Sequence, residues 1–246
     1  MSEIVRRGFG HFMLNIPYIS FGKLVRFALS IRMTRKLAVT SEYFPFHITA
    51  RTVNRDLFPI PLPILWQVYE NYLYYIHLAY GTKLLSFVLM PNHFHLLAQF
   101  PKGNMSETMG FFMGETSRRV GEKSGRINQL YGGRYHRSLI SNEIYFRHAY
   151  KYVYSNPVRA NLVNRVEDYP FSSLHGLLGR RTLVIPIEED TLLFNQEFSW
   201  KTVNWLNRNP QKTHLEEVRC ALRKKSFSLP INKFTRIPSQ LEHQDF

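Results

Sequence analysis

The residues with the clearest chemical potential are two histidines separated by one phenylalanine, in the stretch FVLMPNHFHLLAQF at positions 87–100. The apolar run that follows the Pro-Asn break predicts a β-strand, on which side chains point alternately to two faces. His93 and His95 then share one face with Leu97 and Gln99, and the more apolar residues between them face the core. Two imidazoles at this spacing can converge on one metal ion, but they can equally be hydrogen-bonded surface histidines. A metal site therefore needs a third ligand from elsewhere.

The common catalytic and metal-binding signatures do not supply that ligand. The sequence has no H-E-x-x-H, no C-x-x-C, no G-x-x-x-x-G-K-[ST] and no G-x-G-x-x-G. Its single cysteine, Cys220, excludes an internal disulfide and a cysteine-based zinc site. The remaining candidate is a tyrosine-rich segment, YFRHAYKYVYSNPVRANLV at 145–163, whose helical part must end near Asn156 because Pro157 follows.

Hydrophobic periodicity indicates which elements position these two segments. Strands are predicted at 44–53, 83–90, 93–100 and 134–140, and helices at 63–80, 105–123 and 143–155. Up to the last helix the order is βαββαβ, the ferredoxin-like arrangement of an antiparallel sheet with helices packed on one face. The expected fold is therefore α+β, with an added C-terminal helix that bears the tyrosines.

The charge balance predicts a polyanionic partner. The net charge is +14, from 32 Lys and Arg against 18 Asp and Glu, and nucleic acid is the commonest partner of such a chain. A membrane surface is the rival interpretation. No segment approaches the length of a transmembrane helix, and the N-terminal apolar stretch is too interrupted for a signal peptide. We expect a cytoplasmic protein, consistent with its cysteine usage.

Two segments together carry a family resemblance. MPNHFHLL is followed by YKYVYSNPVRANLV about 60 residues later and then by DYPFSSLHG. This combination resembles the HUH single-tyrosine transposases, in which HUH denotes His-hydrophobic-His, and within them the REP-associated tyrosine transposase branch. The resemblance covers residues 33–178 and implies the same ferredoxin-like fold. It also implies that His93, His95 and Asn156 bind Mg²⁺ or Mn²⁺, and that Tyr152 attacks single-stranded DNA.

The implied reaction is a transesterification at hairpin-forming repeat sequences. The tyrosine would form a 5′-phosphotyrosine link and release a 3′-hydroxyl, and the retained phosphoester would allow a later strand transfer without ATP. Tyr152 and Asn156 are four residues apart and stand on one helical face. Tyr150 and Tyr154 each lie about 200° around the helix from Tyr152. Single-stranded or hairpin DNA is the expected partner, and a homodimer is compatible with the resemblance.

Basic residues concentrate around the two motifs, and we expect them to line a DNA groove. For any one of them, a solvated surface charge is the alternative. They flank the tyrosine helix, the fourth strand and the end of the second helix: Arg147, Lys151, Arg159, Arg134, Arg137, Arg118 and Arg119.

The chain divides into three predicted parts. Residues 1–32 form a basic N-terminal extension of doubtful role, 33–179 form the HUH transposase palm domain, and 180–246 form a C-terminal helical extension and tail. The segment FSLPINKFTRIPSQLEHQDF at the end reads as an extended or disordered tail.

A transposase-type DNA strand-transfer enzyme is the leading functional hypothesis, and three alternatives remain open. A replication initiator or relaxase-like HUH nickase would use the same chemistry without mobilising an element. A catalytically silent protein would bind DNA or RNA hairpins through the same basic surface. A metal-dependent hydrolase built on His93 and His95 is the fourth hypothesis.

Overall fold

The computed structural model describes residues 39–188, 199–232 and 234–244. All of them belong to one compact unit, Val39–Phe246. The predicted extension at 1–32 lies outside the described residues. Within the described residues, no helix combines the length and hydropathy needed to span a membrane.

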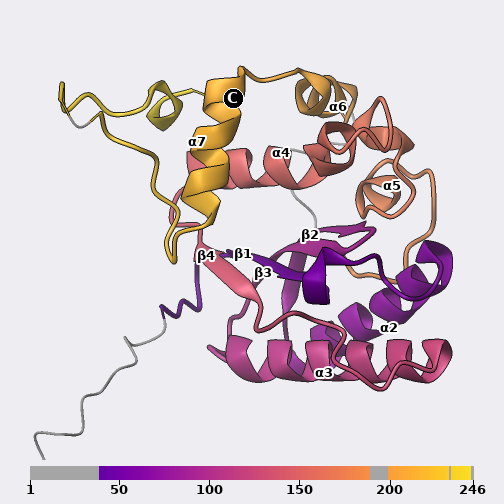
Figure 1. Ribbon diagram of the computed structural model, residues 1–246. Coiled ribbons are helices and arrows are strands. Elements are labelled where there is room, and N and C mark those ends of the chain that lie inside the picture. The colour runs from indigo at the N-terminus through magenta and orange to yellow at the C-terminus, as the bar shows by residue number, and fades with distance from the viewer. Residues whose placement is uncertain (1–38, 189–198, 233, 245–246) are drawn as a thin grey trace, which may run out of the picture. The chain divides into compact units, whose positions relative to one another are not determined.

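A four-stranded antiparallel sheet forms the centre of the unit (Figure 1). Its strands are β1 (Phe46–Arg51), β2 (Lys83–Met90), β3 (His93–Gln99) and β4 (His136–Leu139), in the spatial order β2-β3-β1-β4. Helix α2 (Leu62–Tyr80) connects β1 to β2, and α3 (Met105–Ser124) connects β3 to β4. Every neighbouring pair is antiparallel. The predicted α+β fold with βαββαβ order is confirmed.

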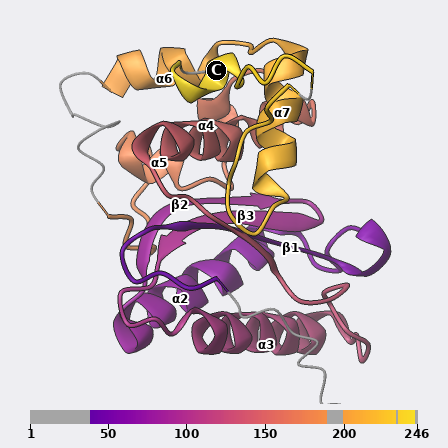
Figure 2. The same ribbon diagram turned by 90° about the vertical axis from the view of Figure 1, so that its left-hand side faces the viewer.

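Helices α2 and α3 cover one face of the sheet and enclose the first core (Figure 2). Helix α2 follows Pro61 and ends at Gly81, whose φ of 69° is the left-handed cap that glycine adopts without strain. The large aromatic members of this core pack edge to face and stacked, at ring-centroid distances that suit such pairs. They are Phe46, Phe87, Phe94, Trp66, Tyr69 and Phe112.

The other face of the sheet, which carries the histidines, is also covered. Helix α4 (Glu143–Arg159) lies across it, together with α5 (Leu174–Leu177), α6 (Ser199–Asn207) and α7 (Lys212–Leu222) (Figure 2). Val88, Met90 and Leu97 point into this second core. A second helical layer therefore buries the face that the sequence pattern marks as the less apolar one.

Helix α4 has a defined start and an unexpected end. The side chain of Asn142 accepts a hydrogen bond from the Tyr145 main-chain nitrogen, which satisfies a free donor of the first turn. The helix continues to Arg159, with Pro157 inside its last turn, and so runs past the stop expected near Asn156. A proline at this point removes one main-chain donor but leaves the short remaining turn in place.

The segment after α7 is anchored to the core near both of its ends, whereas the described residues from 230 to 238 between the anchors are exposed. Phe227, Leu229 and Leu241 are buried in the second core. The Nε2 of His148 on α4 donates to the Leu241 carbonyl at 2.7 Å. Three short 3₁₀ helices complete the described chain: η1 (Val53–Arg55), η2 (Val166–Asp168) and η4 (Gln240–Glu242). The predicted parts 33–179 and 180–246 thus share one core, and their boundary stays a prediction.

We expect Phe227→Ala to destabilise the protein by about 3–5 kcal/mol, because truncating a buried phenylalanine leaves a cavity. The Phe227 side chain is 2% exposed, and its ring centroid lies 4.7 Å from that of Tyr145. Phe234 in the same segment is 96% exposed, so Phe234→Ala is the matched control and should change stability by less than about 0.5 kcal/mol. Urea unfolding measures both. Equal effects of the two substitutions would contradict the packed position of Phe227.

Candidate functional site

His93 and His95 lie side by side at the start of β3, on the face covered by α4. Their ring centroids are 4.9 Å apart. In the register of the sheet, His93 is opposite Arg51 and His95 is opposite Thr49 on β1. His93 is half-buried, whereas His95 is only 5% exposed. The two rings lie on one face of the strand, as the sequence predicts. They are, however, largely covered by other residues of the protein.

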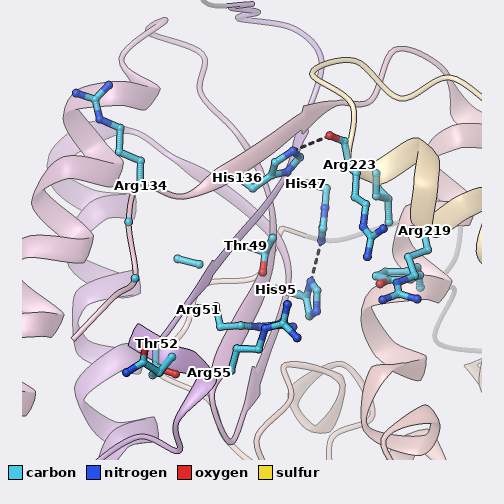
Figure 3. A pocket seen from close by; sticks show the side chains of 16 residues that line it. His47, Thr49, Arg51, Thr52, Arg55, His95, Arg134, His136, Arg219 and Arg223 are labelled. Carbon is cyan, nitrogen blue, oxygen red and sulfur yellow. Dashed lines mark hydrogen bonds between the residues drawn. The ribbon is translucent and has the colours of Figure 1, made fainter. Parts of the chain in front are cut away.

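A third histidine, His47 on β1, joins this pair and was not predicted from the sequence. Its Nε2 and the Nδ1 of His95 are 2.9 Å apart, and the two rings stack with centroids 5.1 Å apart (Figure 3). The only signal in the sequence was its alternation with Thr49 and Arg51 along the strand FHITAR. Bringing it next to His95 requires the register between β1 and β3, which no local pattern reveals.

Burial keeps all three imidazoles in the neutral form. It lowers the pKa of His47 to about 3, with further lowering by His136 and His93. It lowers the pKa of His93 to about 4, helped by the positive charge of Arg51. It also lowers the pKa of His95 well below its usual value. A neutral imidazole is the form that ligates metal ions.

The hydrogen bonds of the predicted ligands leave one donor atom free on each. His93 uses Nδ1 toward Asn92 Oδ1 at 2.7 Å, and His95 uses Nδ1 toward His47. Asn156 donates through Nδ2 to the Tyr152 carbonyl at 2.7 Å. The Nε2 atoms of both histidines and the Oδ1 of Asn156 have no hydrogen-bond partner in the described part of the chain. The amide oxygen is of the kind that Mg²⁺ and Mn²⁺ prefer, and neutral imidazole nitrogens ligate divalent first-row metal ions.

Metal ions in proteins are commonly held by groups of His, Cys, Asp and Glu side chains. Among residues 39–188, 199–232 and 234–244, no three His, Cys, Asp or Glu side chains are grouped so that they could hold a metal ion.

Tyr152 on α4 faces the histidines. Its ring stands edge-on to those of His47 and His95, at centroid distances of 6.2 and 5.8 Å. The guanidinium carbon of Arg159 lies 4.6 Å from the centre of the Tyr152 ring. The side chain is 8% exposed and lines a cavity, and its hydroxyl has no hydrogen-bond partner among the described residues. A tyrosine with a packing role alone normally has its buried hydroxyl bonded.

Other tyrosines of the same helix point elsewhere. The Tyr154 hydroxyl is bonded to Ser173 Oγ at 2.8 Å, and the ring of Tyr150 packs against that of Tyr154 with centroids 4.8 Å apart. The Tyr145 hydroxyl donates to the Glu242 carboxylate. Within this helix, Tyr152 is thus the tyrosine that the fold brings to the histidine pair.

A basic cavity of about 560 Å³ opens beside His47, His95 and Tyr152. Figure 3 shows Arg51 and Arg55 extending toward His95 from one side, and Arg219 and Arg223 approaching from α7 on the other. No carboxylate is among the described residues that line it. Burial lowers the pKa of Arg51, as do the nearby charges of Arg55, Arg219 and Arg223, whereas Tyr152 raises it. The cavity is therefore a concentration of positive charge next to the tyrosine.

The structure brings few of the predicted DNA-binding residues to this cavity. Arg159 reaches Tyr152, and Arg134 lines the cavity but directs its guanidinium away from the histidines (Figure 3). Arg137 pairs with Ile48 across the sheet, which places it on the α2–α3 side, where it donates to the Tyr135 hydroxyl. On α3, Arg118 and Arg119 form ion pairs with Glu115 and Glu122.

Lys151 is buried, contrary to its predicted role at a DNA surface, whereas the role of Arg147, whose side chain is 39% exposed, stays a prediction. Both cations lie against the ring of Trp205 on α6, at 6.0 and 5.4 Å from its centre. Lys151 is 1% exposed and cannot reach a DNA strand in solvent without unpacking. Four residues separate the two side chains, so they share the helical face that α6 covers, and a long charged side chain packs its stem in such a position.

We expect Lys151→Ala to lower stability rather than DNA affinity. Loss of the buried stem and of the cation–π contact with Trp205 should cost on the order of 2 kcal/mol. Urea unfolding and fluorescence-anisotropy titration with single-stranded DNA separate the two effects. A weaker DNA complex formed by a variant of unchanged stability would restore the sequence-based assignment.

Comparison with known proteins gives a consistent result. The model of the family described as "Transposase IS200 like" matches residues 45–156. The REP-associated tyrosine transposase of Escherichia coli K12 is 28% identical over 93 residues, which cover 38% of this chain and 54% of that protein. A putative REP-associated tyrosine transposase of Haemophilus influenzae is 24% identical over 107 residues, covering 39% of this chain and 61% of that protein. The chain thus spans little more than half the length of these curated relatives.

One solved structure shares the fold. It is a REP-associated tyrosine transposase bound to a REP hairpin, with a TM-score of 0.51 at 20% identity, covering 67% of this chain and 98% of that one. The family model ends at Asn156 and includes the HUH motif and Tyr152, but not α6 or α7. The chain is therefore similar to IS200-like transposases over residues 45–156, and the resemblance to REP-associated tyrosine transposases that its two motifs predict is confirmed.

Proposed function

We propose that this protein is a transposase that nicks single-stranded DNA and transfers the cut strand through a 5′-phosphotyrosine at Tyr152. The observation that carries the proposal is that Tyr152, whose hydroxyl is free of hydrogen bonds in the described part of the chain, lines an arginine-rich cavity together with His95. A candidate nucleophile, one candidate metal ligand and phosphate-binding cations thus lie around one cavity, and a phosphodiester transfer needs these three kinds of group.

The transfer step involves one bond made and one bond broken. The Tyr152 oxygen attacks the phosphorus, the bond from phosphorus to the 3′ oxygen breaks, and that oxygen takes up a proton as a free 3′-hydroxyl. The phenolic proton passes to water in the open cavity. Because the product is again a phosphodiester, a 3′-hydroxyl from another strand can reverse the step and complete the transfer.

His93, His95 and Asn156 would hold a divalent ion through the donor atoms that their hydrogen bonds leave free. When bound there, Mg²⁺ or Mn²⁺ would neutralise charge that develops on the phosphate and orient the phosphorus. The protein's own part is to hold the donors. For Nε2 of His95 to be free as a ligand, the proton of the ring must be on Nδ1. The Nδ1–H group then donates a hydrogen bond to Nε2 of His47. His47 thereby fixes the ring orientation and tautomer of His95.

Arginines position the nucleophile and the strand. Arg159 lies over the Tyr152 ring and favours the negative charge that the hydroxyl gains as it reacts. Arg51 and Arg55 reach the same cavity from β1 and η1, where they would bind the phosphates next to the cleaved one. The expected substrate is single-stranded or hairpin-forming DNA, because the attacked phosphate must be accessible. The hairpin-bound relative supports this choice.

The decisive experiment is incubation of the full chain with labelled hairpin DNA and Mn²⁺, followed by denaturing electrophoresis. We expect a cleaved strand and a protein-linked fragment that survives denaturation, both abolished by EDTA. A shift in native gels without cleavage would instead identify a silent hairpin-binding protein. Cleavage without a protein-linked fragment would identify a metal-dependent hydrolase.

A further inference from the structure

Helix α7 forms one wall of the basic cavity, although it lies outside the region matched by the family model. Arg219 and Arg223 are four residues apart, at the end of α7, and therefore share one helical face. Both line the cavity that contains His95 and Tyr152. Figure 3 shows both side chains reaching from α7 toward the histidines.

The end of α7 is fixed relative to the sheet. Nε2 of His136 on β4 donates to the Arg223 carbonyl at 2.8 Å (Figure 3). Just beyond, the Leu139 nitrogen donates to the Lys225 carbonyl at 3.0 Å, and the Phe227 nitrogen donates to the Leu139 carbonyl at 2.9 Å. Since β4 is the direct neighbour of β1, the two arginines are held at a set position beside His47.

The apolar face of α7 holds the helix from the other side. Val218, Ala221 and Leu222 are buried in the second core, against α4. Arg219 and Arg223 are themselves exposed, so the helix presents cations to the cavity while its opposite side is packed. The positions of Arg219 and Arg223 are therefore set by main-chain hydrogen bonds to β4 and by the packing of α7 against the core.

The charges around the cavity are not balanced by the protein. In the described part of the chain, Arg51, Arg55 and Arg223 have no carboxylate within ion-pair distance, and Arg219 pairs with the exposed Glu216 at 3.1 Å. Burial lowers the pKa of Arg51, and the nearby charges of Arg55, Arg219 and Arg223 lower it further. Four guanidiniums on two walls of one cavity suit a ligand with several negative charges along its length.

We propose that α7 is part of the DNA site, and that Arg219 and Arg223 bind backbone phosphates of the strand whose reactive phosphate lies at Tyr152. The DNA strand is then bound from two sides. Arg51 at the end of β1 and Arg55 in η1 lie on one side, and Arg219 and Arg223 at the end of α7 lie on the other. This assignment rests on the proposed function. The C-terminal part of this chain would thus supply a DNA-binding surface outside the region that the family model matches.

The test is the salt dependence of DNA binding by Arg219→Gln/Arg223→Gln, measured by anisotropy with single-stranded hairpin DNA in EDTA, so that no cleavage occurs. Each phosphate contact on a single strand contributes about 0.7 to the slope of log K against log salt. The double variant should therefore bind more weakly and lose about 1.4 from the slope. Arg219→Lys/Arg223→Lys keeps both charges and should retain most of the slope.

The matched control removes two cations that do not line the cavity, Lys201 on α6 and Arg208 just after the end of α6. Lys201→Gln/Arg208→Gln makes the same change in net charge and should leave the slope unchanged. If the double glutamine variant does not fold, as judged by thermal unfolding, the single variants Arg219→Gln and Arg223→Gln should each lose about 0.7.

The outcomes separate this inference from the proposed function. An unchanged slope in the α7 variants, with normal adduct formation by the wild-type protein, overturns the role of α7 and leaves the transposase proposal intact. An equal loss in the α6 control also overturns it, because only net charge would then matter. A reduced slope confined to the α7 variants supports the wall even where the wild-type protein forms no adduct, a result that would refute the proposed function alone.

Discussion

Replacing Tyr152 by phenylalanine is expected to abolish the covalent protein–DNA adduct, with a loss of at least about 10³-fold in the rate of its formation. The substitution removes one oxygen and keeps the ring, so the edge-on contacts with His47 and His95 and the stacking of Arg159 are retained. The hydroxyl has no hydrogen-bond partner in the described part of the chain, so its removal should leave stability nearly unchanged. Denaturing electrophoresis of labelled DNA measures the adduct, and thermal unfolding checks the fold.

Tyr154→Phe is the matched control from the same helix. Its hydroxyl is bonded to Ser173 Oγ in the core, so the variant should lose about 1 kcal/mol of stability and still form the adduct. The two substitutions are thus expected to have opposite effects on stability and chemistry. An adduct of normal yield in Tyr152→Phe, or none in Tyr154→Phe, would refute the assignment of the nucleophile.

Removing either histidine of the HUH motif is expected to lower metal-dependent cleavage by more than about 100-fold. Loss of a supporting residue behind a ligand already costs about 10–100-fold in metal affinity or activity, and loss of the ligand itself should cost more. Calorimetric titration with Mn²⁺ gives a readout that does not depend on cleavage, and both His93→Ala and His95→Ala should lose the binding event.

The two histidine variants should differ in stability, because the structure places them differently. The sequence predicts that both truncations leave no cavity in the core, but only half-buried His93 fits that prediction. His95→Ala removes a buried ring and leaves Nε2 of His47 without its partner, which should cost about 1–3 kcal/mol. His214→Ala, on α7, is the control and should preserve stability and Mn²⁺ binding. Retained Mn²⁺ binding in both HUH variants would show that the motif is structural.

The order of strands and helices could be predicted from the sequence because it depends on local patterns. Apolar alternation, the Pro91-Asn92 turn and the helical spacing between Pro63 and Tyr80 are each visible within a short window. The second helical layer could not be predicted in the same way. Residues 180–246 pack through scattered apolar side chains such as Phe227 and Leu241, which have no strong period, and whose partners on α4 are about 80–100 residues away in the chain.

The basic residues show how helix geometry limits a prediction made from proximity in sequence. With about 100° per residue, Arg159 returns to within about 20° of Tyr152, and it is the cation of α4 that reaches the tyrosine. Lys151 and Arg147 are turned away by about 100° and 140°, toward α6. Arg51 and Arg55 are more than 160 residues from Arg219 and Arg223 in the chain, so only the folded chain brings the two pairs together.

The measurement that tests the central claim most directly is identification of the residue that becomes linked to DNA in the wild-type protein. The adduct formed with hairpin DNA and Mn²⁺ would be digested with nuclease and trypsin and analysed by tandem mass spectrometry. Trypsin should release YVYSNPVR, which contains both Tyr152 and Tyr154, so fragmentation must resolve the two. The account predicts a nucleotide joined through its 5′ phosphate to Tyr152. A nucleotide on Tyr154 or on any other residue, or a link through a 3′ phosphate, would contradict it.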